Sequence, residues 1–284
     1  MNRQFFSFLV AAIAISAAVV LSSCGDDDND EGGTEGLVYL PYGSDGYSVD
    51  GGGFVTSGAV VIPPSYRGLP VVHIAQSAFL NTDITSVTIP ASVKRIGNGA
   101  FSSCFSLETV TFESGSSLET IGEYAFALSS ALTSITIPAS VKDIRLHAFQ
   151  DCSNLATVTF ESGISLETIS EGVFFNVALT SIIIPASVKN IGPMAFAGCS
   201  NLATVTFANG GSLEIIAHSA FIETTAVTNI AVPASVKSIH IFAFGGWTDA
   251  QTITILGHAN EESAIEAWGW DWQRGCNAII VYGQ

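Results

Sequence analysis

The chain has 284 residues and a formal net charge of −16, from 9 Lys and Arg against 25 Asp and Glu. Apolar residues make up 48% of it and charged residues only 12%, about half the usual share of roughly 25%. This composition excludes an acidic disordered chain, because such chains are poor in apolar residues. The net charge argues against nucleic acid as a partner, since binding the phosphate backbone needs clustered Lys and Arg. Five cysteines are too few for a scaffold of this length built on disulfides.

Residues 1–23 predict a secretion signal. Arg3 is followed by an uncharged apolar run over residues 5–21, which is short for a transmembrane helix of about 20 residues and typical of the hydrophobic region of a signal peptide. The run ends in Leu-Ser-Ser-Cys at residues 21–24, which resembles the bacterial lipoprotein signal. That resemblance implies lipidation at Cys24 and contact with a membrane through a lipid anchor. A plain cleaved signal and an N-terminal membrane helix are the alternatives.

Residues 24–36 predict an acidic flexible tether. The run Gly-Asp-Asp-Asp-Asn-Asp-Glu-Gly-Gly at 25–33 combines like charges with glycines, and such a run cannot bury itself. It resembles the acidic patch that follows the lipid-bearing cysteine in lipoproteins of Bacteroides-type bacteria exported to the outer face of the outer membrane. The resemblance implies an outer-membrane anchor with the protein facing the cell exterior. A simple spacer is the alternative.

The rest of the chain consists of two alternating repeat units. The first carries Ile-Pro-Ala-Ser-Val-Lys, which begins at residues 89, 137 and 184 and returns as Val-Pro-Ala-Ser-Val-Lys at 232. The second carries Thr-Phe-Glu-Ser-Gly, which begins at residues 111 and 159 and is degenerate at 206. Every unit ends in Ile, three variable residues, Ala or Val, and then a terminal Phe: Phe79, Phe101, Phe126, Phe149, Phe174, Phe196, Phe221 and Phe244. This period of about 24 residues predicts stacked units, because one unit alone cannot bury its apolar edge.

Each unit also predicts one β-strand. Its core reads Leu-x-x-Val-x-Phe or Leu-x-x-Ile-x-Ile, the pattern of a leucine-rich repeat at this period. The last residues alternate as in a half-buried strand, so Val110 and Phe112 are expected to point inward while Thr109 and Thr111 point outward. In every second unit a proline follows the strand, where its missing N–H ends the pairing. The tail from Ile to Phe predicts a helical turn or a tight bend.

The alternating Ile-Pro-x-Ser-Val-x-x-Ile-Gly-x-x-Ala-Phe and Cys-Ser-x-Leu units resemble the BspA-type leucine-rich repeat proteins. The resemblance covers residues 58–256 and implies an α/β-type repeat solenoid, a right-handed coil with one parallel β-sheet face. We expect an N-terminal cap at 37–57 and a C-terminal cap at 257–284, because open solenoid ends expose core. The family implies a bacterial surface protein that binds host or microbial partners, commonly as an adhesin. Arg145 and His240 replace the Gly after Ile, which leaves the bends of those two units open.

Three cysteines occupy the same place in alternate units, three residues after a terminal Phe: Cys104, Cys152 and Cys199. Stacking places them about 9–10 Å apart, whereas a disulfide needs Cα atoms within about 7 Å. They are therefore predicted to be unpaired and buried. The state of Cys276 stays open.

No constellation predicts catalysis, a metal or a cofactor. The five histidines share no metal-ligand spacing and no nucleophilic partner: His73, His147, His218, His240 and His258. Repeated glutamates predict a solvated row rather than an acid–base pair: Glu108, Glu119, Glu167 and Glu214. The sequence has no glycine-rich phosphate loop. We therefore expect a protein that is not an enzyme.

The outward strand positions are the candidate ligand-binding residues: Thr88, Thr109, Thr111, Thr136, Thr157, Thr159, Thr204 and Thr206. We expect them on a concave face, the surface that solenoids present to partners. The alternative is that Thr simply suits an exposed pleated sheet. Ile183, Asn229 and Ala231 interrupt the rows, which argues against an ice-binding ladder.

The last residues, 261–284, contain Trp268, Trp270 and Trp272. They predict a short helix and a closing strand, with the tryptophans covering the last unit. The rival interpretation is an aromatic platform for sugars, which requires two exposed and coplanar rings.

The leading functional hypothesis is a non-catalytic cell-surface recognition module that adheres to a host or microbial protein through the solenoid. One alternative is a glycan-binding accessory lipoprotein of a nutrient-uptake system. Another is a purely structural envelope protein without a ligand.

Overall fold

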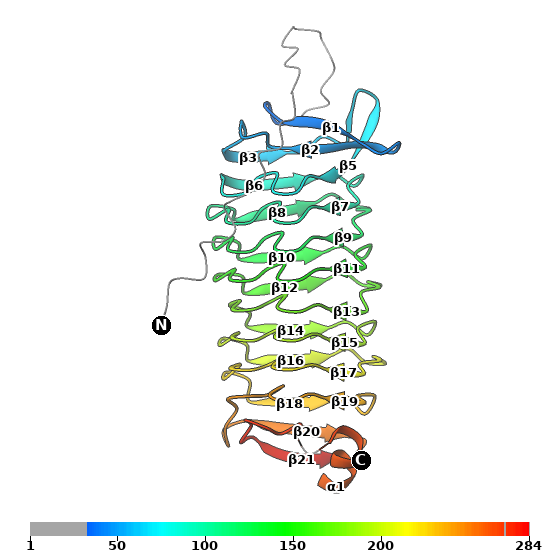
Figure 1. Cartoon of the computed structure of the whole chain (residues 1–284), viewed down its shortest axis with the longest axis vertical. Helices are drawn as coiled ribbons and strands as arrows, with labels where there is room; N and C mark the ends of the chain where they lie inside the picture. The colour runs from blue at the N-terminus through cyan, green and yellow to red at the C-terminus, as the bar shows by residue number, and fades with distance from the viewer. Residues whose placement is uncertain (1–32, 270, 284) are drawn as a thin grey trace.

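The computed structural model describes residues 33–269 and 271–283 and shows a β-solenoid of about ten turns, stacked in a nearly straight column (Figure 1). The predicted signal peptide at 1–23, the predicted lipidation site Cys24 and the tether up to residue 32 lie outside the described residues, as does Trp270.

One side of the column, which we call the long-strand face, carries strands of four to seven residues that run parallel to one another. Along each strand buried and exposed side chains alternate, as a pleated strand requires. In one of them Ile135 and Ile137 are buried while Ser134 and Thr136 are exposed. The strands are β3 (Ser57–Val61), β6 (Asp83–Ile89), β8 (Thr109–Phe112), β10 (Ser134–Ile137), β12 (Thr157–Phe160), β14 (Ser181–Ile184), β16 (Thr204–Phe207), β18 (Asn229–Val232), β20 (Thr252–Leu256) and β21 (Ile279–Gly283).

A second side, the short-strand face, carries another row of parallel strands, most of them two residues long. They are β2 (Gly46–Asp50), β5 (Leu69–Ile74), β7 (Arg95–Ile96), β9 (Thr120–Ile121), β11 (Asp143–Ile144), β13 (Thr168–Ile169), β15 (Asn190–Ile191), β17 (Ile215–Ile216) and β19 (Ser238–Ile239). At the N-terminal end β1 (Val38–Tyr42) pairs antiparallel with β2, and β4 (Ser65–Tyr66) pairs antiparallel with β5.

The tail of every unit is a tight bend rather than a helical turn. In each bend the residue three after the Ile and the residue two after the terminal Phe have positive φ, as His147 (54°) and Asp151 (56°) do. Non-glycine residues rarely adopt this conformation. Here hydrogen bonds to the next turn hold it, because His147 N donates to Glu171 O at 3.0 Å and Asp151 N donates to Phe175 O at 2.9 Å.

Five units lack Gly after Ile, and the two that carry Arg145 and His240 in its place keep the same connection to their neighbours. The backbone N–H of Arg145 donates to Ile121 O at 3.0 Å, and that of His240 donates to Ile216 O at 2.9 Å. Gly97 makes the equivalent bond in its own unit. Backbone pairing, not the glycine, therefore defines the bend.

The terminal phenylalanines form a single internal file. Successive rings from Phe79 to Phe244 stack with centroids 5.1 to 5.8 Å apart, and all eight are buried. Buried Leu, Ile and Val surround them in one core that reaches from Val49 to Trp272. The predicted shared core is confirmed.

Two seams divide the long-strand face. Strand pairing forms three sheets, β3–β6–β8, β10–β12–β14–β16 and β18–β20–β21, and β12 and β14 share only the pair Thr157–Ser181. Fully paired neighbours such as Ser134 and Thr157 are 23 residues apart, that partial pair is 24 apart, and Phe112 and Ile137 across a seam are 25 apart. Inside the regular repeats we attribute the seams to the extra residues, which lengthen the turn and displace the next strand. The end units do not follow this rule, since β20 pairs with β21 at a spacing of 27 residues, Thr252 with Ile279.

At the C-terminal end the helix α1 (Glu261–Trp268) precedes β21, which pairs parallel with β20. The Asn260 side chain accepts from Ser263 N in a capping box, which satisfies a free N–H of the first turn. The predicted order of a short helix and then a strand is thus found. Within residues 33–269 and 271–283, no helix has the length and apolar character needed to cross a membrane.

The predicted repeat solenoid with parallel strands is confirmed, and the structure changes three details. Among the described residues α1 is the sole α-helix, so the chain has much less helix than an α/β label implies. A second row of strands exists beside the expected one. The column runs nearly straight in the view of Figure 1, without the horseshoe curvature that the expected concave face implies. Strands stack at about 4.8 Å on both faces, whereas curvature arises when helices about 10 Å wide occupy one side.

Candidate functional site

The predicted threonines lie in two rows on the long-strand face. Strand register places Thr88 beside Thr111 in one sheet and Thr136 beside Thr159 in the next. Seven of the eight are exposed, and Thr88 is half-buried. The seams interrupt the rows, so the hydroxyl groups form separate patches instead of one continuous ladder.

A groove of about 460 Å³ lies between β12 and β14, where the two strands share a single residue pair. Thr157 and Thr159 line it from β12, Ile183 lines it from β14, and the loop 161–164 also contributes. Ile183 takes the place of a threonine in its row, and its side chain is 63% exposed. The middle of the face therefore combines an exposed apolar side chain, a groove and surrounding hydroxyl groups.

Ser187 adds a polar group to the wall of this groove. Its hydroxyl is buried and has no hydrogen-bond partner among the described residues, and the same holds for Ser140 two units earlier. The equivalent Ser92 and Ser235 donate to backbone carbonyls of the preceding unit. The Ser187 hydroxyl is therefore an unused hydrogen-bonding group beside the groove.

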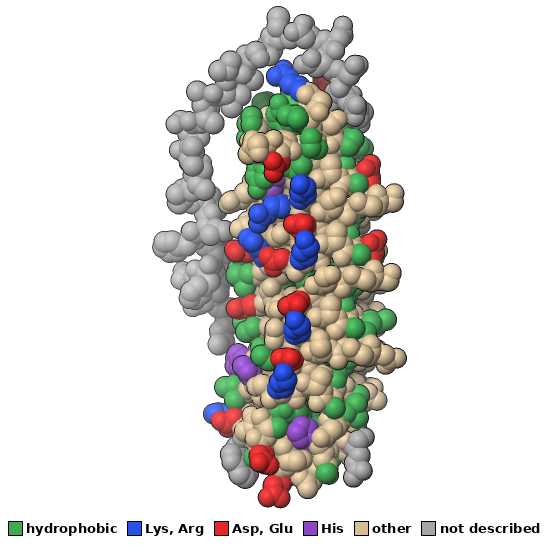
Figure 2. Space-filling view, turned by 90° about the vertical axis from the view of Figure 1, so that its right-hand side faces the viewer, with side chains coloured by type: hydrophobic (Ala, Val, Ile, Leu, Met, Phe, Trp, Pro, Cys, Tyr) green, Lys and Arg blue, Asp and Glu red, His purple; other side chains and the backbone are tan. Residues whose placement is uncertain are grey.

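The short-strand face carries a row in which Lys and Glu alternate (Figure 2). We call this row the Lys–Glu ladder; its members are Lys94, Glu119, Lys142, Glu167, Lys189, Glu214 and Lys237. Three lysines bind the glutamate of the preceding unit, with Nζ to Oε1 distances of 2.7 to 2.8 Å. The hydrogen bond and charge of Lys142 hold the pKa of Glu119 below its ordinary value. Glu119 and Glu167 are exposed as predicted, whereas Glu214 is half-buried and the exposed Glu108 lies apart from this row, directly before β8. Their pairing with lysines was not predicted.

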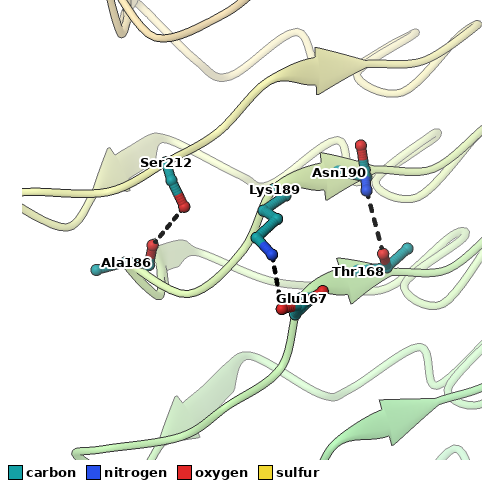
Figure 3. Close-up of polar contacts among 6 residues, drawn as sticks. All are labelled: Glu167, Thr168, Ala186, Lys189, Asn190 and Ser212. Carbon is teal, nitrogen blue, oxygen red and sulfur yellow. Dashed lines mark hydrogen bonds and ion pairs between the residues drawn. The ribbon is translucent and has the colours of Figure 1, made fainter.

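Side chains of this face join consecutive turns. Figure 3 shows Lys189 Nζ donating to Glu167 Oε1 at 2.7 Å and, next to it, Asn190 Nδ2 donating to Thr168 Oγ1 at 3.4 Å. Both contacts connect residues 22 positions apart. These polar groups therefore hold the register between turns, and their hydrogen-bonding capacity is already used within the chain.

The three aligned cysteines are buried and unpaired, as predicted. Each thiol donates to the carbonyl of the terminal Phe in the preceding unit at 3.0 Å. Burial raises the pKa of Cys199 to about 12 and also raises that of Cys152. Cys276 is free and half-buried.

The sequence pattern of the BspA type Leucine rich repeat region matches the chain in six copies, over residues 72–203 and 167–264. The chain belongs to the BspA-type leucine-rich repeat family. No curated protein sequence matches it.

Solved structures of bacterial proteins resemble this BspA-type protein to different degrees. The pneumococcal vaccine antigen PcpA superposes with a TM-score of 0.60 at 23% identity, over 78% of this chain and 63% of PcpA, so the chain spans less than two thirds of it. A leucine-rich cell surface protein of Faecalibacterium prausnitzii gives a TM-score of 0.46 at 22% identity, over 88% of this chain and 94% of that one. A leucine-rich repeat protein of Bacteroides capillosus gives 0.38 at 32% identity, over 45% and 96%.

The histidines of this BspA-type protein lie on different turns. Among the described residues no three His, Cys, Asp or Glu side chains come close enough to hold a metal ion. His218 and His240 line a recess of about 400 Å³ beside the C-terminal cap, together with Trp268 and Asp271. Their spacing along the chain does not indicate that they lie together.

The tryptophans of the C-terminal segment pack against the last turns. Trp272 is buried, and its ring stands at 82° to that of Trp268, with centroids 5.4 Å apart. The Trp268 indole donates to Val236 O at 3.1 Å. These two rings are therefore not the exposed coplanar pair that a sugar platform requires, and Trp270 lies outside the described residues.

Proposed function

We propose that this protein is a non-catalytic cell-surface recognition module that binds a host or microbial protein through the long-strand face. The observation that carries the proposal is Ile183, a largely exposed apolar side chain beside a groove and among the exposed hydroxyl groups of Thr157, Thr159 and Thr206. Protein interfaces concentrate their binding energy in a few central anchors surrounded by polar contacts.

The charge pattern of the face supports a protein partner. From β8 to β18 no outward strand position carries a charged side chain, and the cores of protein interfaces are likewise depleted of charge. Stacked repeats of this family also provide an extended surface of the kind that solenoids use for binding. The polar groups of the short-strand face, by contrast, are largely paired with one another.

The proposal includes the organisation of the whole chain: a signal peptide at 1–23, lipidation at Cys24, a tether at 24–36, caps at 37–57 and 257–284, and a solenoid at 58–256. The support is the lipoprotein-like Leu-Ser-Ser-Cys and the acidic run after it. Protease treatment of intact cells tests the outward-facing location. Rapid loss of the repeat region is expected, and a repeat region that survives until the outer membrane is opened contradicts that location.

Binding of the purified chain to immobilised matrix proteins and bacterial surface proteins tests the recognition surface. Ile183→Lys places a charge at the centre of the proposed interface and is expected to weaken binding at least tenfold. Ile241→Lys is the matched control, because Ile241 is an exposed isoleucine outside the long-strand face. Ile183→Thr, which restores the threonine row, separates loss of the apolar anchor from introduction of a charge.

Equal loss of binding in both lysine variants, or none in either, contradicts the long-strand face as the site. Binding to a glycan array but to no protein favours the glycan-capture alternative. Absence of binding to both the proteins and the glycan array favours a structural envelope protein.

A further inference from the structure

A smaller recess lies on the short-strand face, close to the N-terminal end, with a volume of about 270 Å³. We call it the basic pocket; its main lining residues are Tyr42, His73, Arg95, Thr120 and Arg145. Strand register brings three of them together, since His73 on β5 pairs with Arg95 on β7, and Arg95 pairs with Thr120 on β9. Arg145 comes from the turn after β11 and Tyr42 from β1. Residues up to 103 positions apart thus meet in one recess.

Positive charge is in excess at this pocket. Among the described residues Arg95 and the adjacent Lys94 form no ion pair, whereas the other three lysines of the Lys–Glu ladder are each bound to a glutamate. Figure 2 shows Lys and Arg side chains gathered over this part of the face. In a chain with a net charge of −16, a recess with unpaired cations concentrates positive potential and attracts anions.

The nearby acidic groups are already engaged. Glu119 is close enough to feel the charges of Lys94 and Arg95, but its carboxylate is hydrogen-bonded to Lys142. Asp143 accepts from Arg145 Nε at 2.9 Å. The terminal amino groups of Arg145 make no hydrogen bond within the described residues, so they remain available for a ligand oxygen.

His73 is held in a fixed orientation at the edge of the pocket. Its Nδ1 lies 2.9 Å from Ser48 Oγ, and its ring stacks on Tyr42 with centroids 4.4 Å apart. Burial and then the charge of Arg95 lower its pKa, so the imidazole is neutral near pH 7. When Ser48 donates to Nδ1, the ring proton is on Nε2, which then acts as a donor.

Neutral hydrogen-bonding groups complete the lining. Thr120, Gln76 and Asn98 contribute hydroxyl and amide groups around the two arginines. Further along the face the charges of the Lys–Glu ladder cancel in pairs, so no basic track continues for a long polyanion. The pocket therefore suits a compact ligand that combines one anionic group with several hydroxyl groups.

We propose that the basic pocket binds an acidic sugar unit, whose carboxylate or sulfate group lies between Arg95 and Arg145 and whose hydroxyl groups contact Thr120 and the adjacent amides. Arginine suits this role because its planar guanidinium bonds oxyanions through two parallel N–H groups. The site is separate from the long-strand face and does not depend on protein binding there.

Calorimetric titration of the full chain at low salt tests the proposal, with sodium glucuronate and glucose 6-sulfate as probes. Glucose, acetate and inorganic sulfate test whether both the charge and the sugar ring are needed, and a short Glu-containing peptide tests a protein source of the carboxylate. The variants are Arg95→Gln, Arg145→Gln and Arg95→Lys, the last retaining charge without the planar guanidinium. Lys237→Gln makes the same charge change on the same face, far from the pocket, and thermal unfolding checks that each variant folds.

Saturable binding of at least one acidic sugar, reduced at least tenfold by Arg95→Gln, only partly rescued by Arg95→Lys and unchanged by Lys237→Gln, is the expected result. Which of the two probes binds more tightly distinguishes a carboxylate from a sulfate ligand. Absence of binding overturns the proposal, as does an equal loss in Lys237→Gln. Acetate, inorganic sulfate or the peptide binding as tightly as the sugars overturns it too, because the sugar ring would then contribute nothing.

Discussion

Phe149 shows what a single position of the repeat contributes. Its side chain is fully buried, and its ring stacks between those of Phe126 and Phe174 at 5.3 and 5.7 Å. The same ring therefore fills the core of its own turn and forms the contact surface for both neighbours. Its removal leaves a cavity that a column of identical hydrogen-bonded turns cannot easily close.

Phe149→Ala is expected to lower the free energy of unfolding by about 3–5 kcal/mol, the usual cost of a Phe-to-Ala change in a core. Phe105→Ala is the matched control, because the Phe105 side chain is 52% exposed, and it should cost less than about 0.5 kcal/mol. Urea unfolding followed by circular dichroism measures both. Similar costs for the two variants would contradict the internal file.

The buried thiols predict a loss of stability at alkaline pH. Because burial raises the pKa of Cys152 and Cys199 in the folded state, the unfolded chain releases their protons first. The two thiols therefore make their full contribution to the free energy of unfolding below the ordinary thiol pKa of 9.0. This contribution is lost as the pH rises above that value. Above that pH, each fully buried thiol should lower the free energy of unfolding by about 1.4 kcal/mol per pH unit.

The double variant Cys152→Ser, Cys199→Ser tests this effect. Serine fits the same place in the repeat, since Ser129 donates from it to Phe101 O at 2.7 Å. Between pH 8 and 9.5 the free energy of unfolding of the variant should fall less steeply than that of the parent chain. Parallel pH curves would show that the thiols do not titrate on unfolding.

At the scale of the element, each short strand is held in place by its contacts with the next short strand. In the Lys–Glu ladder the Lys142 backbone N–H donates to Glu119 O at 2.9 Å, and its side chain binds the Glu119 carboxylate at 2.8 Å. Backbone and side chain thus connect the same two turns. Exposed ion pairs contribute little to stability. We therefore infer that the ladder mainly helps to specify which turns lie next to each other, since pairing with the next turn but one would bring like charges together.

Lys142→Glu places three glutamates in consecutive turns. We expect a loss of stability larger than that of Lys142→Gln, because like charges on neighbouring strands repel, but much smaller than that of Phe149→Ala. The difference between Glu and Gln at this position should shrink at high salt, since salt screens exposed charges. Thermal unfolding at low and high ionic strength measures this. A difference that is independent of salt would argue against charge repulsion as its cause.

At the scale of the molecule, each turn is stabilised only by its contacts with neighbouring turns. Each turn contacts the one before and the one after, as the pairing order of the short-strand face shows. Such a column behaves as a chain of nearest-neighbour couplings, in which terminal turns have fewer partners than central ones. The seams after β8 and β16 further weaken two of these couplings on one face.

Hydrogen exchange followed by mass spectrometry should therefore show graded protection. Backbone amides in the central turns, residues 120–200, are expected to exchange most slowly, because they are protected from both sides. Amides of β21 and of the N-terminal hairpin β1–β2 should exchange faster. Uniform exchange along the column would instead indicate one all-or-none unit.

Much of the architecture could be predicted from the amino-acid sequence, because it depends on short-range pattern. The spacing of the terminal phenylalanines predicted the internal file, and the alternation at Thr109–Phe112 predicted which side chains face the core. The aligned position of Cys152 and Cys199 predicted their burial without a disulfide. Each of these inferences needs only the residues of one unit and the assumption that units stack.

Other features depend on how the units stack. The 25-residue spacing between Phe112 and Ile137 is visible in the sequence, yet only the structure shows that it opens a seam. Likewise, the amino-acid sequence shows Ile183 only as an interruption of the threonine row, and the structure adds the groove beside it. Prediction failed there because strand pairing responds to turn length in three dimensions.

The sequence by itself determined the repeat, the buried rows and the exposed hydroxyl rows, because apolar periodicity dictates which side of each turn is removed from water. Only the tertiary structure decided that the column is straight, that Lys and Glu pair between turns, and that His73, Arg95 and Arg145 line one recess. Those outcomes depend on the register between residues at least 22 positions apart. That register is set jointly by turn length, backbone hydrogen bonding and core packing, and no local pattern encodes it.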